Sequence, residues 1–547
     1  MRLLFFGFSL LVLALTLISC NVDAKNIRAQ TSQKQLPVLI GKEANQIMKI
    51  TIINNNEKES YVNEIGVSTS GTTDLSDLEN VAIFYTGKEN KFSSENLFSN
   101  VPPSDYMVFE GNQKLEKDTS YLWVSYRINK NANLINMVDA QCTSILSSLG
   151  NIPVVPDSTA SSITQRLGVA VRQQGQDGVH TYRIPGLTTT SRGTLLACYD
   201  VRRDSGRDLQ GDIDIGISRS TDGGNTWEPM SIALDMEDWG GLPEKFNGVS
   251  DACLLATTNG DVYLAGLWMH GVINPEGKWI EGLTIDSTAW NHQWRNKGSQ
   301  AGYGVKQTSQ FLISKSSDDG RTWSPPVNIT KMGKKEEDWL YAPGPGHGIA
   351  MDDGTLVFPT QGRDKVGGTF SNITYSKDGG KTWQASQPAY LNTTESMVVQ
   401  LDDGSLMLNM RDNRNRSNKT ESNGRAVSIT NDLGNTWKEH SSSHGALIEP
   451  VCMASLHKHH YTEDGAKKTL LLFSNPNDKY HRINQTIKVS FDNGKTWPEE
   501  NWILLDEDRG AGYSCITSID EQVVGILYEG SQAHMTFQKI PLSTLLK

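Results

Sequence analysis

Five copies of one eight-residue pattern restrict the fold of this chain more than any other feature of its sequence. The copies are STDGGNTW, SSDDGRTW, SKDGGKTW, TNDLGNTW and SFDNGKTW, and they begin at Ser220, Ser316, Ser376, Thr430 and Ser490. Each copy follows a run with alternating apolar residues, such as DIGISRS or TIKVS. Strand-rich units that recur about every 40–60 residues are typical of β-propellers. We therefore predict an all-β protein in which residues 165–547 form a six-bladed β-propeller.

The side chains within each copy have local structural roles. The Ser or Thr in the first position and the Asp in the third can accept hydrogen bonds from nearby backbone N–H groups and close a turn. The Gly in the fifth position tolerates a positive φ, and the Trp in the eighth can pack between strands. Catalysis by these acids would require five equivalent sites. We therefore interpret them as turn residues: Asp222, Asp318, Asp378, Asp432 and Asp492.

The N-terminus has the pattern of an export signal. Arg2 precedes the apolar run LLFFGFSLLVLALTLIS, which ends at Cys20. A short apolar run after a cation is typical of a signal peptide, so residues 1–19 are excluded from the fold. The sequence LISC favours lipidation of Cys20, with residues 20–35 as a tether. We expect secretion across the inner membrane and a lipoprotein of the bacterial envelope or surface. The alternative is a plain secretory peptide and a soluble periplasmic or extracellular protein.

A separate β domain is predicted before the repeats. Residues 36–150 contain short runs rich in β-branched and aromatic residues, such as QIMKITIINN, VAIFYTG and SYLWVSYRI, separated by polar turns. This pattern favours an antiparallel β-sandwich-like domain. Residues 151–164 contain two prolines and several small polar residues, which indicates a linker.

Charge and cysteine content exclude several classes of function. The chain of 547 residues has a formal net charge of −11, which argues against a nucleic-acid-binding protein. The five cysteines after Cys20 are widely spaced and form no CxxC pair, so neither a zinc site nor a disulfide framework is indicated. We expect no metal and no organic cofactor.

Residues that do not repeat carry the functional argument. The stretch TYRIPGL contains an Arg-Ile-Pro triplet and precedes all five turns. In this combination the chain resembles the bacterial exo-α-sialidases (neuraminidases) with Asp-box repeats, over about residues 165–547. The resemblance implies that three arginines hold the carboxylate of a sialic acid: Arg183, Arg411 and Arg482. Guanidinium groups suit this task because they donate paired, charge-assisted hydrogen bonds.

The same resemblance implies the catalytic groups. Tyr513 in GAGYSC matches the nucleophile, and Glu395 in TTES matches the base that activates it. Asp208 matches the general acid and base, six residues after Arg202, although Asp204 and Asp212 lie in the same acidic loop. A neutral phenol suits this substrate, because a carboxylate nucleophile would be repelled by the sugar's own carboxylate.

Two further residues match substrate-binding positions of the family, and two more are predicted to support the site. Arg202 matches an arginine near the sugar 4-hydroxyl, and Asp251 matches an acid near the N-acyl or 4-hydroxyl side. Glu529 in LYEG matches the acid that orients Arg183. Gln361 is also predicted to lie in the pocket.

The resemblance thus implies an exo-α-sialidase that hydrolyses terminal α-linked sialic acid from sialylated glycans with retention. The alternatives are a trans-sialidase, a non-catalytic sialic-acid-binding propeller, and a scaffold in which the repeats mark only a fold. A carbohydrate-binding module and a structural spacer both suit residues 36–150. Three tryptophans in the insertion 271–310 would either stack on sugars or pack the loop: Trp279, Trp290 and Trp294. The sequence does not indicate an oligomeric state, and it predicts membrane contact only through the lipid.

Overall fold

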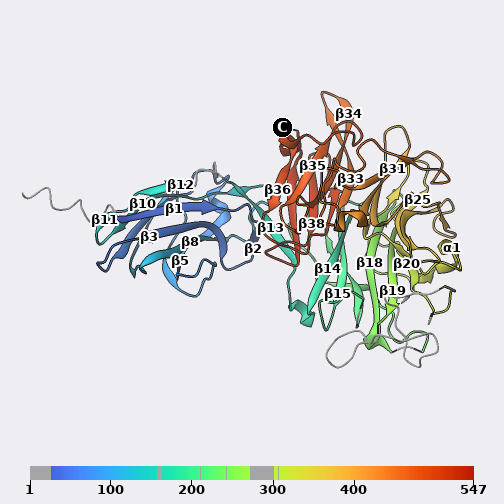
Figure 1. The fold of residues 1–547 in the computed structure, drawn as a ribbon, viewed down its shortest axis with the longest axis horizontal. Helices are drawn as coiled ribbons and strands as arrows, with labels where there is room; N and C mark the ends of the chain where they lie inside the picture. The colour runs from blue at the N-terminus through green and yellow to red at the C-terminus, as the bar shows by residue number, and fades with distance from the viewer. Residues whose placement is uncertain are drawn as a thin grey trace, which may run out of the picture. The chain divides into compact units, whose positions relative to one another are not determined.

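The computed structural model describes residues 26–156, 163–209, 211–241, 243–271, 301–305 and 307–546 (Figure 1). The predicted signal peptide, Cys20 and the three tryptophans of the insertion lie outside these ranges. The chain divides into two compact units, residues 1–167 and 168–547. Within the described ranges, no helix has the length and apolar composition needed to cross a membrane.

The first unit contains two β-sheets, as predicted. One has the strand order β12-β1-β3-β8-β5-β6 and the other β11-β10-β4-β7. Strands β1 and β12 run parallel, and the other neighbours in these two sheets are antiparallel. The strands are β1 (Ile27–Gln33), β3 (Asn45–Asn54), β4 (Tyr61–Ser68), β5 (Leu78–Gly87), β6 (Leu97–Val101), β7 (Tyr106–Lys114), β8 (Asp118–Ile128), β10 (Gln141–Ser147), β11 (Gly150–Asn151) and β12 (Val154–Pro156). Two short strands complete the unit, β2 (Val38–Ile40) and β9 (Met137–Val138).

Both predicted boundaries of this unit were wrong. The tether prediction for residues 20–35 fails at β1, whose Ile27 and Ala29 are buried and which pairs with β3 along its whole length. The linker prediction for residues 151–164 fails at β12, which pairs with β1. These strands were missed because one is polar on its exposed face and the other has only three residues, too few for a recognisable alternation.

The described residues of the second unit form six β-blades, which confirms the predicted propeller (Figure 1). The first blade contains β14 (Thr181–Thr189), β15 (Leu195–Arg202), β16 (Ile213–Ser220) and β17 (Ser231–Leu234). The second contains β18 (Asn247–Ala256), β19 (Val262–His270), β20 (Gln310–Ser316) and β21 (Val327–Asn328). The third contains β22 (Leu340–Pro343), β24 (Ile349–Ala350), β25 (Leu356–Arg363), β26 (Thr369–Ser376), β27 (Gln384–Ala385) and β28 (Tyr390–Leu391).

The fourth blade contains β29 (Thr393–Gln400), β30 (Leu406–Asp412), β31 (Ala426–Thr430) and β32 (Lys438–Glu439). The fifth contains β33 (Ser455–Glu463), β34 (Ala466–Pro476), β35 (Gln485–Ser490) and β36 (Ile503–Asp506). The sixth blade contains β37 (Ser514–Ser518), β38 (Val523–Tyr528), β39 (Met535–Pro541) and the end of β13 (Gln165–Arg172). Residues outside the regular blades include β23 (Gly346–His347) and two single-turn helices, α1 (Thr330–Gly333) and α2 (Leu542–Leu545).

The first strand of this unit closes the propeller. Val169 of β13 pairs with Phe537 of β39, so the chain's early segment supplies the outer strand of the last blade. The ring is therefore held by backbone hydrogen bonds between segments that are more than 350 residues apart in sequence. This last blade is the one without the eight-residue pattern, because its outer strand comes from the other end of the unit.

Each of the five patterns forms the turn between the third and fourth strands of a blade. In the fourth copy, Thr430 Oγ1 donates to Asp432 Oδ1 at 2.8 Å and accepts from the backbone N–H of Gly434 at 2.9 Å. Asp432 Oδ1 also accepts the N–H of Thr436 at 2.9 Å. The other four aspartates bind the threonine of their own turn in the same way. These bonds confirm the structural interpretation of the five acids.

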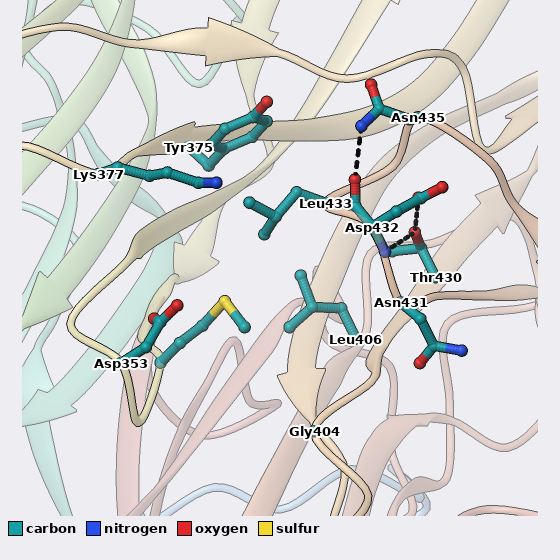
Figure 2. A pocket seen from close by; sticks show the side chains of 11 residues that line it. Asp353, Tyr375, Lys377, Gly404, Leu406, Thr430, Asn431, Asp432, Leu433 and Asn435 are labelled. Carbon is teal, nitrogen blue, oxygen red and sulfur yellow. Dashed lines mark hydrogen bonds between the residues drawn. The ribbon is translucent and has the colours of Figure 1, made fainter.

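The fourth position of every turn has a left-handed backbone. Its φ is 69° at Gly223, 67° at Asp319, 70° at Gly379, 55° at Leu433 and 57° at Asn493. Gly, Asn and Asp adopt this conformation readily, whereas a leucine is strained by roughly 1–2 kcal/mol. Leu433 packs against a core cluster that contains residues of both the third and the fourth blade, and it lines a cavity together with Tyr375 of the preceding blade (Figure 2). The contact with the neighbouring blade accounts for a leucine in this position.

The turn acids predict how stability depends on pH. Hydrogen bonds from Thr436 lower the pKa of Asp432 to about 2. Partial burial of Asp318 opposes its hydrogen bonds from Thr322, but the bonds prevail and its pKa is also about 2. The unfolded pKa of aspartate is about 3.9. The turns therefore stabilise the fold above about pH 4 and lose this contribution as the pH falls toward 2.

Thermal melts across this pH range test the expectation. The melting temperature should fall steeply between about pH 4 and 2. A variant with Asp318→Asn and Asp432→Asn should melt lower at neutral pH and show a shallower fall in acid. Equal acid slopes for the variant and the wild-type protein would contradict the assignment.

Candidate active site

The residues with predicted catalytic and binding roles lie around one polar cavity of about 240 Å³. Strands β14, β15, β18, β29 and β30, together with the loops before β16, β35 and β37, supply its side chains. All eight residues predicted to be catalytic or substrate-binding line it: Arg183, Arg202, Asp208, Asp251, Glu395, Arg411, Arg482 and Tyr513. Ile184 and Gly206 complete the lining, and the two predicted supporting residues, Gln361 and Glu529, contact lining residues from behind.

Tyr513 and Glu395 form the closest polar contact in the cavity. The Tyr513 hydroxyl donates to Glu395 Oε1 in a very short hydrogen bond. Arg411 Nη1 donates to Glu395 Oε2 at 2.5 Å and to the Tyr513 hydroxyl at 3.0 Å. A phenol is thus held between a carboxylate that can accept its proton and a cation that can stabilise its anion.

Burial keeps the proton on Tyr513. It raises the pKa of the phenol well above its usual value, and the negative Glu395 raises it further, while Arg411 and Arg482 oppose the shift. The phenol is therefore neutral at rest. It can lose its proton to Glu395 only when an electrophile draws negative charge away from the oxygen.

The three arginines predicted to bind a carboxylate come from three blades. Arg183 lies on β14, Arg411 on β30, and Arg482 in the loop between β34 and β35. The guanidinium carbons of Arg183 and Arg482 lie 5.6 and 5.4 Å from the centre of the Tyr513 ring. Arg482 Nη1 donates to the carbonyl oxygen of Ala511 at 2.7 Å. The cations therefore surround the phenol and make the cavity a site for an anion.

Glu529 holds both the Arg183 side chain and the backbone of Tyr513 in place. Its Oε1 accepts from Arg183 Nε at 2.5 Å and from the backbone N–H of Ile184 at 2.8 Å, and its Oε2 accepts from the backbone N–H of Tyr513 at 3.0 Å. Burial opposes ionisation, but Arg183 and these bonds lower the pKa of Glu529 below its usual value. Ile184 has a φ of 63°, a strained backbone for a β-branched residue. The carboxylate of Glu529 holds this conformation in place.

Asp208 is held by hydrogen bonds that link it through Arg202 to the buried carboxylate of Asp200. Its Oδ1 accepts from Arg202 Nη2 at 2.8 Å, and the same nitrogen donates to Asp200 Oδ2 at 2.8 Å. Asp200 also accepts from Arg202 Nε at 3.1 Å and from Ser250 Oγ at 2.7 Å. Burial raises the pKa of Asp200 to about 6 although Arg202 opposes the shift. Neither Asp204 nor Asp212 lines the cavity, so the geometry favours Asp208 among the three acids.

Asp251 lies on β18 with a left-handed backbone, at a φ of 56°. Gln361 Nε2 donates to Asp251 Oδ2 at 3.1 Å and to the carbonyl oxygen of Pro343 at 3.2 Å. Burial raises the pKa of Asp251 well above its usual value, and the negative Glu395 and Asp208 add to the rise. Gln361 therefore supports Asp251 rather than lining the cavity itself.

Two features of the site were missing from the sequence prediction. Asp200 is two residues before Arg202 on one strand, a spacing that places both side chains on the same face and could have indicated the pair. The second is a fully buried ion pair between Arg425 and Glu449, with Nη1 and Oε2 at 2.7 Å. Glu449 accepts the N–H of Asp412, next to Arg411, at 2.7 Å. No sequence pattern links these two residues.

Comparisons with known proteins agree with this geometry. The family model of a BNR repeat-like domain matches residues 184–522, and the model of the N-terminal domain of BNR-repeat neuraminidase matches residues 24–149. A sialidase of Bacteroides fragilis is 39% identical over 94% of this chain and 95% of its own length. A sialidase of Clostridium perfringens is 30% identical over 64% of this chain and 86% of its own length.

Solved structures give the same result. A Hadza microbial sialidase has a TM-score of 0.83 and 38% identity, over 94% of this chain and 99% of that one. The Trypanosoma rangeli sialidase, with a TM-score of 0.51 and 20% identity over 71% of this chain and 57% of its own, shares the fold. The family models and the long match at 39% identity show that this chain belongs to the sialidase family of BNR-repeat neuraminidases, which are glycoside hydrolases.

Proposed function

We propose that the protein is an exo-α-sialidase that hydrolyses terminal α-linked sialic acid from glycoproteins, glycolipids or oligosaccharides with net retention. The observation that carries the proposal is the hydrogen bond from Tyr513 to Glu395 within a cavity that also holds the three arginines predicted to bind a carboxylate. Most retaining glycosidases use a carboxylate nucleophile, and sialidases are the known class with a tyrosine instead.

The arginines bind the substrate through its carboxylate. In this proposal, Arg183, Arg411 and Arg482 donate to the carboxylate on the anomeric carbon, and each charge-assisted bond contributes roughly 1.5–3 kcal/mol. The same charge selects the substrate, because a neutral sugar offers no carboxylate to accept hydrogen bonds from these guanidinium groups. Arg202 and Asp251 then face the 4-hydroxyl and N-acyl side of the sugar.

The first chemical step forms a tyrosyl-enzyme. Asp208 gives its proton to the glycosidic oxygen, and the bond from that oxygen to the anomeric carbon breaks. Glu395 takes the proton of Tyr513, and the phenolic oxygen forms a bond to the anomeric carbon. The aglycone leaves as a neutral alcohol, Asp208 becomes a carboxylate, and Glu395 becomes a carboxylic acid.

The second step returns every group to its first state. Asp208 takes a proton from a water molecule, and the resulting hydroxide attacks the anomeric carbon from the face that the aglycone left. The bond to Tyr513 breaks, and Glu395 returns the proton to the phenolic oxygen. Two displacements at one carbon give net retention.

Trapping of the covalent intermediate tests this proposal. Incubation with a 2,3-difluorosialic acid should give an adduct on the tryptic peptide that contains Tyr513. Fluorine at carbon 3 slows both chemical steps, but fluoride at carbon 2 is a good leaving group, so the first step stays faster than the second and the adduct accumulates. A complex of the Trypanosoma rangeli sialidase with 2,3-difluorosialic acid is described as a covalent intermediate. Tandem mass spectrometry locates the modified residue. An adduct on any other residue, or sialyl transfer to added lactose in place of hydrolysis, would overturn the corresponding part of the proposal.

A further inference from the structure

The loop that carries Asp208 leaves this acid exposed. The loop joins β15 (Leu195–Arg202) to β16 (Ile213–Ser220), and the Asp208 side chain is 56% accessible to solvent. By contrast, Arg202, its hydrogen-bond partner, is 1% accessible. A general acid must keep its proton within hydrogen-bond distance of the leaving oxygen. An exposed carboxyl therefore depends on whatever fixes the backbone on both sides of it.

Arg202 fixes the loop on the N-terminal side of the acid. Its Nη1 donates to the carbonyl oxygen of Gly206 at 3.1 Å, and its Nη2 donates to Asp208 itself at 2.8 Å. These bonds fix the part of the loop that precedes Asp208 in sequence.

Leu209 fixes the loop on the other side. Its side chain is completely buried, in a cluster with Leu267 and Met269 of β19 and Leu340 and Ala342 of β22. Those four residues belong to the second and third blades, whereas the loop of Leu209 belongs to the first blade. The Leu209 side chain, next to the exposed acid, therefore packs in an apolar cluster formed by residues of the second and third blades.

The backbone at Leu209 is strained. Its φ is 51°, in the left-handed region that a leucine occupies at a cost. A strained residue persists only when its surroundings hold it there, and such residues gather at functional sites. In this loop the surroundings are the buried cluster. The left-handed turn directs the side chain of Leu209 inward while its neighbour Asp208 faces the cavity.

We propose that Leu209 is a positioning residue for proton transfer by Asp208. Its buried side chain anchors the loop, so that the exposed carboxyl stays beside the glycosidic oxygen. The inference rests on the proposed role of Asp208 as general acid. It adds a residue that does not touch the substrate and acts only through its neighbour.

Substrates with different leaving groups distinguish a positioning role of Leu209 from a merely structural one. A sugar alcohol is a poor leaving group and needs a proton from Asp208, whereas 4-nitrophenol leaves as an anion without one. The value of kcat/KM covers the steps up to loss of the aglycone. Displacement of Asp208 should therefore lower kcat/KM for sialyllactose and leave kcat/KM for a 4-nitrophenyl sialoside nearly unchanged. General destabilisation would lower both values equally.

The experiment compares both substrates across matched variants. Asp208→Ala should lower kcat/KM for sialyllactose about 10²–10⁴-fold, with little change for the aryl sialoside. Leu209→Ala should show the same bias at about 10–100-fold, since a shift of about 1 Å costs up to about 10²-fold. Leu209→Met, which keeps the buried volume, should restore sialyllactose activity to within about threefold. The matched control is Leu433→Ala, the same substitution at a left-handed leucine that does not line the cavity, which should show no bias.

The outcomes separate the two claims. If Asp208→Ala shows no leaving-group bias, the proposed acid is wrong. If Asp208→Ala shows the bias and Leu209→Ala keeps the wild-type ratio of the two kcat/KM values, the inference about Leu209 is wrong. Should Leu209→Ala fail to fold, Leu209→Gly removes the side chain and relieves the backbone strain, and it must show the same bias.

Discussion

Replacement of Tyr513 by phenylalanine should lower kcat for sialic acid release on the order of 10³-fold, because the variant lacks the oxygen that bonds to the anomeric carbon. KM should change much less. The phenylalanine ring keeps the packing of Tyr513 in its buried cluster, and the guanidinium groups of Arg183 and Arg482 keep a ring at 5.6 and 5.4 Å. Glu395 keeps its ion pair with Arg411, so no buried charge is left without a partner.

Steady-state kinetics with a fluorogenic sialoside measures this effect. The matched control is Tyr341→Phe, which removes the hydroxyl of another fully buried tyrosine, bonded to Thr360 and Thr374 in the third blade. Its kcat should stay within about twofold of wild type, because Tyr341 does not line the cavity. A Tyr513→Phe variant with kcat within tenfold of wild type would refute the nucleophile assignment and leave the family membership intact.

The propeller could be predicted from the sequence because its signal is local and repeated. Each turn needs a hydroxyl, an acid and a glycine within five residues, and the hydrogen bonds of Thr430, Asp432 and Gly434 show how those groups close it. Five such turns at blade spacing leave few alternatives to a propeller. The first strand of the N-terminal unit escaped prediction for the opposite reason, since only Ile27 and Ala29 among its residues are apolar and no pattern repeats.

The residues that line the cavity followed from family resemblance rather than from local physics. Tyr513 and Glu395 are 118 residues apart, and only the closed propeller brings them together. The residues behind them were harder to predict. Arg425 and Glu449 form a buried pair across loops with no periodic pattern, and Leu209 is an ordinary apolar residue until its φ and its burial are known.

Replacement of Glu529 should affect both stability and catalysis. Glu529→Ala removes the acceptor for Arg183 Nε and for the N–H groups of Ile184 and Tyr513. Breaking a buried ion pair costs about 3–5 kcal/mol, and Arg183 retains enough exposure, 22%, for solvent to reduce that cost toward the lower value. The activity should also fall about 10²-fold or more, because Arg183 and Tyr513 lose their common support.

Glu529→Gln separates the two functions of this carboxylate. The amide has one oxygen, and that oxygen is best placed where Oε1 accepts two bonds, from Arg183 and Ile184. The amide NH₂ then faces the N–H of Tyr513, and two donors in contact displace the nucleophile. We therefore expect Glu529→Gln to lower kcat more than it raises KM, whereas Arg183→Ala should raise KM most. Urea unfolding and steady-state kinetics measure these effects, with exposed Glu521→Gln as the control. A Glu529→Gln variant that raises KM and leaves kcat unchanged would show that the carboxylate supports Arg183 alone.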